Sequence, residues 1–181
     1  MRASGRRRVV ITGVGAVTPL GNDVRSSWEQ LVAGRGAAGP ITAFDTTGFA
    51  VTFACEAKDF EPTQWIDPKQ ARRMDRFAQM IVASAHQARA DAGLEVEREC
   101  DRVGVSVATA MGGLKSFENA CKTLIKRGPG RVNPFAITAI IPNSGAARVS
   151  IELGTKGPLS SQCTACAAST MAIGDGMDAI R

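Results

Sequence analysis

Two stretches of the chain pass from a strand-like pattern into a helix-like pattern across a turn of small residues. Residues 102–109 alternate, with Val103, Val105 and Val107 on one face, and Gly112-Gly113 separates them from a helical pattern. Residues 159–164 predict a second strand, and an alanine-rich helix begins close to Cys166. Strands that alternate with helices predict an α/β fold with helices packed on a mixed or parallel sheet.

The rest of the chain fits the same fold class. The pattern predicts, in chain order, a buried strand at 8–13, a glycine-rich loop with tight backbone contacts at 13–21, a helix capped by Asn22 or Asp23, an excursion with short strands at 34–68, a long helix at 69–92 and a helix at 143–153. Because the chain shows about three clear core strands and stops at Arg181 directly after a helix, we expect a fragment or one half of a duplicated architecture.

Composition and charge limit the class of protein. With 44% apolar and 22% charged residues, the chain resembles a globular protein, and its longest apolar stretches fall far short of the roughly 20 residues of a membrane span. No run resembles a secretory h-region after a basic start, so a cytoplasmic location is expected. Five cysteines form an odd count, so reduced thiols are expected. The net charge of +5 includes a basic tail at residues 1–7 and predicts an acidic partner. No zinc-finger spacing, aromatic RNA-binding pattern or basic zipper accompanies it, which argues against nucleic acid.

Two cofactor hypotheses fail on detail. The glycine run that begins at Gly13 lacks the third glycine of a dinucleotide-binding loop, and Pro19 obstructs an immediate helix start. A zinc site would need two ligands besides Cys163 and Cys166, whereas the other cysteines are isolated and His86 has no second ligand three or four residues away. The sequence predicts neither a metal nor a redox cofactor.

The pair Cys163 and Cys166 leaves three interpretations open. A Cys-x-x-Cys pair suits a thiol redox protein. Cys166 alone suits a nucleophile, because helix N-terminal amides stabilise a thiolate and can donate into an oxyanion hole, and the small neighbours Ala165, Ala167 and Ala168 leave room for a thioester. Cys166 is otherwise a small buried residue, as most free cysteines are.

Several separated segments are similar to one family. Thr164-Ala165-Cys166-Ala167 after Gly157-Pro158 resembles the active-site signature of the elongating β-ketoacyl-acyl carrier protein synthases. The other matching segments, in order, are Val10-Ile11-Thr12-Gly13-Val14-Gly15, Thr18-Pro19-Leu20-Gly21, Arg73-Met74-Asp75-Arg76-Phe77, Met111-Gly112-Gly113 and Asn133-Pro134-Phe135. The resemblance covers almost all of the chain after Arg7.

The resemblance implies a fold and assigns the nucleophile and the catalytic histidines to different halves of it. The fold would be thiolase-like, with two similar halves forming five αβαβα layers, and residues 8–181 would be the N-terminal, nucleophile-bearing half. In the family, the cysteine that matches Cys166 takes an acyl chain from a carrier protein as a thioester, and malonyl carrier protein then condenses with it and loses CO₂. The catalytic histidines come from the second half, so this chain alone is expected to be inactive in condensation.

The resemblance also implies binding residues and partners. Met111 matches a gate residue of the acyl pocket, Phe135 and Ala165 match substrate-binding positions, and Ala136 replaces a second aromatic residue that the family often has. Basic docking positions for an acidic acyl carrier protein match Lys69, Arg72, Arg73 and Arg131. A homodimer is expected through residues 159–164. A ketosynthase or chain-length-factor-like subunit of a type II polyketide system remains an alternative, as does the redox protein.

Overall fold

The computed structural model describes residues 7–181, so the part of the basic tail at residues 1–6 lies outside the described residues. Its helices are α1 (Val24–Val32), α2 (Pro68–Ala71), α3 (Arg76–Asp91), α4 (Leu114–Arg127), α5 (Ala136–Ile140), α6 (Ser144–Leu153) and α7 (Ala168–Ile180), and its strands are β1 (Ala38–Pro40), β2 (Phe53–Cys55), β3 (Val105–Ala108) and β4 (Leu159–Gln162). Short 3₁₀ turns are η1 (Pro62–Gln64), η2 (Val96–Arg98), η3 (Cys100–Arg102), η4 (Pro129–Arg131) and η5 (Ala165–Ala167).

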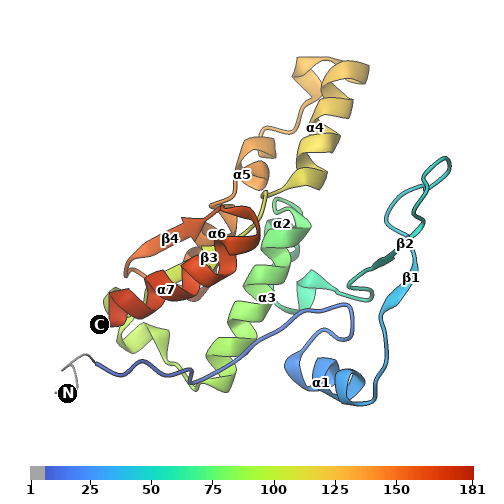
Figure 1. Ribbon diagram of the computed structural model, residues 1–181. Coiled ribbons are helices and arrows are strands. Elements are labelled where there is room, and N and C mark those ends of the chain that lie inside the picture. The colour runs from blue at the N-terminus through green and yellow to red at the C-terminus, as the bar shows by residue number, and fades with distance from the viewer. Residues whose placement is uncertain (1–6) are drawn as a thin grey trace.

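A parallel pair of strands, β3 and β4, forms the centre of the fold. Val105 pairs with Leu159 and Ala108 with Gln162, so both strands end at the same edge. Helices α6 and α7 both pack against this pair (Figure 1). The two helices lie on opposite faces of β3, because neighbouring side chains of a strand point to opposite sides. Ser106 donates its hydroxyl to the Ala172 carbonyl oxygen of α7 (2.8 Å), whereas Val105 belongs to the hydrophobic core shared with α6. The α/β prediction is confirmed.

The hydrophobic core lies between α3, α6 and the Val105 face of β3. Its fully or nearly buried members include Ala78 and Val82 of α3 and Ala146 of α6. Gly145 permits this close packing, because a Cβ there would lie 2.9 Å from the Cδ1 atom of Ile81. The core therefore fixes α6, and through it the sheet that carries the two loops described below.

The predicted strand at residues 8–13 is wrong. These residues carry no strand in the structure, and the side chain of Ile11 is 85% exposed. The segment that follows, residues 14–16, lies along α3 and donates backbone hydrogen bonds to side chains of that helix. The nitrogen of Val14 donates to Asp91 (2.9 Å), and the nitrogen of Ala16 donates to Gln87 (3.1 Å). The apolar pattern predicted that residues 8–13 are buried in a sheet. No strand among the described residues pairs with them, so they stay outside any sheet.

The predicted helix at 69–92 is two helices. It is interrupted at residues 72–75, where Asp75 becomes the N-cap of α3 and accepts from the nitrogen of Phe77 (3.3 Å). The helix after Asp23 is confirmed as α1, with Asp23 as its cap. The excursion at 34–68 is also confirmed, with β1 and β2 forming an antiparallel ribbon, and α5 is a short helix that the pattern did not predict.

Candidate functional site

Cys166 lies in η5, between the end of β4 and the start of α7, as the sequence predicted. The chain reverses there: Ala165 has a positive φ of 50°, a conformation that costs energy for any residue with a Cβ, and the nitrogen of Ala167 donates to the carbonyl oxygen of Thr164 (3.1 Å). We call residues 163–167 the nucleophile loop. Its tight turn leaves Cys166 exposed, and no disulfide uses it. A strained, accessible thiol at a strand-to-helix turn suits a nucleophile.

Met111 belongs to the loop that follows β3, residues 109–113, which we call the Met111 loop. Gly112 has a φ of 83°, and a Cβ on it would lie 2.5 Å from the carbonyl oxygen of Ile140, so this position requires glycine. The side chain of Met111 is 64% exposed. Because β3 and β4 end at the same edge, the Met111 loop and the nucleophile loop begin side by side. The thiol of Cys163 joins them, donating to the carbonyl oxygen of Ala110 (3.5 Å).

Phe135 makes a contact that the sequence did not reveal. The guanidinium carbon of Arg73 lies 4.4 Å from the centre of the Phe135 ring, a cation–π arrangement. One predicted docking residue thus touches one predicted substrate-binding residue. No interaction in the described part of the chain joins Phe135 to Cys166.

The predicted docking residues are spread over two elements. Lys69 belongs to α2 and is exposed, Arg72 and Arg73 follow it, and Arg131 is exposed at the end of η4. A cavity of about 240 Å³ is lined by Arg72 and Arg73 together with Met74, Ser116, Asn119, Ala120, Thr123, Asn133, Ala136 and Ala139. Within residues 7–181, none of the four basic side chains forms an ion pair, and no carboxylate lines this cavity.

Within residues 7–181, no described contact joins His86 to either loop. It faces Trp65, with ring centres 6.3 Å apart and planes 28° from parallel, and its buried Nε2 has no hydrogen-bond partner. Burial lowers the pKa of the His86 imidazole below its usual value. The contacts fit a structural residue of α3.

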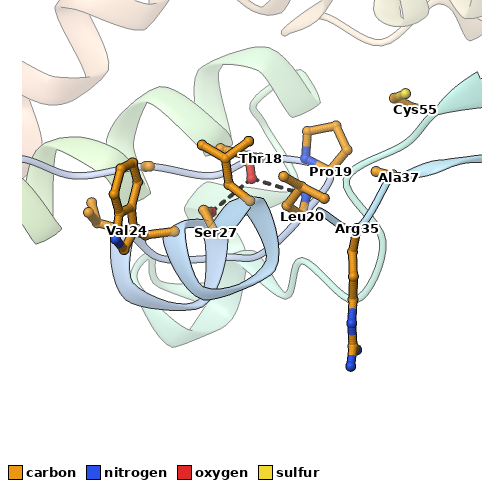
Figure 2. Close-up of a pocket in the computed structure, with 12 residues that line it drawn as sticks. Thr18, Pro19, Leu20, Val24, Ser27, Arg35, Ala37 and Cys55 are labelled. Carbon is orange, nitrogen blue, oxygen red and sulfur yellow. Dashed lines mark hydrogen bonds between the residues drawn. The ribbon is translucent and has the colours of Figure 1, made fainter. Parts of the chain in front are cut away.

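A second, larger cleft contains none of the predicted site residues. It has a volume of about 550 Å³ and is lined by α1, by the loop before it, by residues 35–37 and by Cys55. Figure 2 shows Val24 and Ser27 on its helical wall. Thr18 organises the loop by binding the hydroxyl of Ser27 (2.8 Å) and accepting from the nitrogen of Leu20 (3.1 Å). The cleft is apolar, and only Arg35 and Cys55 bring an ionisable group to its lining.

Two further features concern metals and membranes. No group of three or more His, Cys, Asp or Glu side chains in residues 7–181 is placed to hold a metal ion. Over the same residues, no helix combines the length and the apolar character that crossing a bilayer requires.

Solved structures define the class of protein. Over 97% of its length the chain superimposes on the ishigamide ketosynthase/chain length factor with a TM-score of 0.89 at 35% identity, and on a β-ketoacyl synthase from Burkholderia phymatum STM815 with a TM-score of 0.81 at 29% identity. It covers 44% of each of those chains. The fold is therefore the thiolase-like fold of ketosynthases, as predicted.

Sequence comparison defines the family. The chain belongs to the β-ketoacyl synthases, since the N-terminal domain of that family matches residues 6–181. It is 45% identical over 171 residues to 3-oxoacyl-[acyl-carrier-protein] synthase 2 of Synechocystis sp. (strain ATCC 27184 / PCC 6803 / Kazusa), and 43% identical over 179 residues to the protein of that name from Staphylococcus aureus (strain COL). These alignments cover 94% and 98% of this chain but only 41% and 43% of the relatives.

Proposed function

We propose that this chain is the nucleophile-bearing half of a 3-oxoacyl-[acyl-carrier-protein] synthase, with Cys166 as the acyl acceptor. The observation that carries the proposal is the exposed thiol in a strained turn between β4 and α7, in a chain 43–45% identical to synthases of that name. The domain assignment, residues 8–181 as one nucleophile-bearing unit, is part of the same proposal.

The chemistry has two steps. The Cys166 thiolate attacks the thioester carbonyl of an acyl carrier protein, the carbonyl oxygen becomes an oxyanion, and the carrier thiolate leaves as the new Cys166 thioester forms. A malonyl thioester then loses CO₂, its carbanion equivalent attacks the stored acyl carbonyl, and the Cys166 thiolate leaves. The backbone N–H of Cys166, which donates to no other group within residues 7–181, would donate to such an oxyanion.

The second half of the fold would supply the family's catalytic histidines. His86 is the one histidine of this sequence, and it stacks on Trp65. We therefore expect the isolated chain to accept an acyl group without completing the condensation. Formation of a β-ketoacyl product by the purified 181-residue chain alone would contradict this division.

Acylation can be tested by intact mass. The purified protein is incubated with an acyl carrier protein thioester, and we expect one acyl adduct per chain, mapped by peptide analysis to Cys166. Cys166→Ala should abolish the adduct, whereas Cys55→Ala, which also removes an exposed thiol, should retain it. An adduct that persists in Cys166→Ala, or none in a folded sample that contains the complementary half, would refute the proposed nucleophile.

We place the carrier-protein docking surface at Lys69, Arg72, Arg73 and Arg131. The support is electrostatic: these cations form no ion pair in the described part of the chain, and Arg72 and Arg73 line a cavity whose other polar groups are uncharged. One solved relative is a type II polyketide acyl carrier protein in complex with its ketosynthase, which the chain matches at 26% identity with a TM-score of 0.79 over 97% of its length.

Charge reversal tests this surface. Lys69→Glu with Arg72→Glu should lower the affinity for an acidic carrier protein by roughly tenfold or more at low salt, and the loss should shrink as salt rises. Binding is measured by calorimetry, with Lys156→Glu, an exposed cation on the connection from α6 to β4, as the control. Equal affinities for the double variant and the control would remove these residues from the docking surface.

We also propose a homodimer through residues 159–164. The support is that β4 pairs with β3 on one side, while its other edge has no strand partner within residues 7–181. Met111, Phe135 and Ala165 remain the proposed acyl-binding residues.

A ketosynthase of a type II polyketide system is the second candidate. The solved relative whose title names a type II polyketide acyl carrier protein and its ketosynthase, with a TM-score of 0.79, favours it. Cys166 argues against the related chain-length factor, because that subunit usually lacks the nucleophile. Repeated condensation without intervening reduction, assayed with the complete enzyme, would identify the polyketide pathway.

A further inference from the structure

Cys163 is the one cysteine of the Cys-x-x-Cys motif to which the proposed function gives no role. It directly follows β4 and is the first residue of the nucleophile loop. Its thiol donates to the carbonyl oxygen of Ala110 at 3.5 Å, and Ala110 directly precedes Met111. Cys163 therefore connects the loop that carries Cys166 with the loop that carries Met111.

This connection continues the β3–β4 ladder by one position. The last backbone hydrogen bond between the two segments runs from the nitrogen of Thr109 to the carbonyl oxygen of Gln162 (3.0 Å). Beyond it the chains separate into the two loops. Within the described residues, the thiol of Cys163 makes the one hydrogen bond that joins residues 163–167 to residues 109–113.

Within the described residues, the other hydrogen bonds of the Met111 loop hold its first residue, Thr109, and its last two, Gly112 and Gly113. The nitrogen of Gly112 donates to the Thr109 hydroxyl (3.1 Å), and that of Gly113 donates to the carbonyl oxygen of Ile140 (2.9 Å). The peptide plane between Ala110 and Met111 is held by Cys163 through its carbonyl oxygen. Since the orientation of that plane affects the direction in which the Met111 side chain leaves the backbone, the hydrogen bond from Cys163 restrains that direction.

We propose that Cys163 is a positioning residue that sets the orientation of the Met111 side chain, in the loop next to the nucleophile loop, and thereby the length of acyl chain that Cys166 accepts. This inference rests on the proposed acylation of Cys166. A thiol is a weak hydrogen-bond donor, so the constraint is modest. Serine retains a donor at nearly the same place, whereas alanine removes it. The two substitutions separate hydrogen bonding from any chemistry of sulfur.

The first measurement is the acyl-length preference of Cys166. Wild type, Cys163→Ser and Cys163→Ala are each incubated with a mixture of short and long acyl carrier protein thioesters, and the two adducts are quantified by mass. We expect Cys163→Ala to change the ratio about two- to fivefold, the size of one weak hydrogen bond, and Cys163→Ser to keep it. A ratio that is the same in all three proteins overturns the proposal.

Hydrogen exchange of the Met111 loop provides a readout that needs no acylation. The amides of Gly112 and Gly113 should exchange faster in Cys163→Ala than in wild type or Cys163→Ser. If wild type together with the complementary half takes up no acyl group, the proposed function fails. Unchanged exchange in Cys163→Ala would overturn the inference separately. If serine and alanine change both readouts equally, the sulfur itself is needed, and the positioning role by hydrogen bonding is wrong.

Discussion

Gly15→Ala should destabilise the folded chain by about 2–3 kcal/mol, because the added methyl has no space. A Cβ on Gly15 would overlap the carbonyl oxygen of Ser84 and lie 2.8 Å from the backbone nitrogen of Ala88. Both neighbours are helix backbone and cannot rotate away as a side chain can. The expected fall in melting temperature is roughly 4–12 °C for a domain of this size, measured by circular dichroism.

Gly36→Ala is the matched control for this prediction. A Cβ at Gly36 meets no atom within 4 Å, and its φ lies outside the left-handed region. Restricting the unfolded chain should make that variant neutral or slightly more stable. Equal melting temperatures for the two variants would show that residues 13–17 do not pack against α3 as described.

The same glycine illustrates what sequence could predict. Gly13 and Gly15 predicted tight backbone contacts, and the contacts exist, but with α3 rather than around a strand. The apolar run before them predicted a buried strand. A local sequence pattern predicts that a segment is extended, but it does not show which other element the segment packs against. Burial depends on that second element. In the described residues that partner is missing, and Ile11 is exposed.

The position of Cys166 was predictable because its signals are local. The strand before it, the alanine-rich helix after it and the small residues between them all lie within one short segment. The adjacency of the Met111 loop followed less directly, since it needed β3 and β4 to be neighbouring parallel strands. The Arg73–Phe135 contact and the Cys163 hydrogen bond join residues far apart in sequence, so no periodicity could reveal them.

Asp75 was missed for a different physical reason. The apolar positions around it continue at helical spacing, so the pattern predicted one helix through it. In the structure its carboxylate accepts from the nitrogen of Phe77, a bond that caps the N-terminus of α3. It also accepts from the nitrogen of Ser116 in the first turn of α4 (2.8 Å). An aspartate within a helical apolar pattern does not by itself show that the helix is interrupted there. In this chain the interruption at Asp75 goes with its hydrogen bond to Ser116, which is distant in sequence.

Asp75→Ala should therefore cost about 2–4 kcal/mol of stability. Asp75 is 7% exposed, so its removal loses an N-cap, worth about 1 kcal/mol, and leaves an amide of α4 without a partner, worth about 1–3 kcal/mol more. Asp23→Ala removes an exposed cap of α1 that binds no second helix, and it should cost only about 1 kcal/mol.

Urea unfolding of Asp75→Ala and Asp23→Ala measures the difference between their losses of stability. Hydrogen exchange shows which segments of the chain are destabilised. Exchange in Asp75→Ala should rise at the start of α4 and in the adjacent Met111 loop as well as in α3, because one carboxylate holds both helices. A loss confined to the first turn of α3, and equal to that of Asp23→Ala, would mean that the bond to Ser116 contributes nothing. Asp75→Asn separates the two contacts: asparagine can still cap α3, but its single acceptor oxygen cannot readily serve α4 as well.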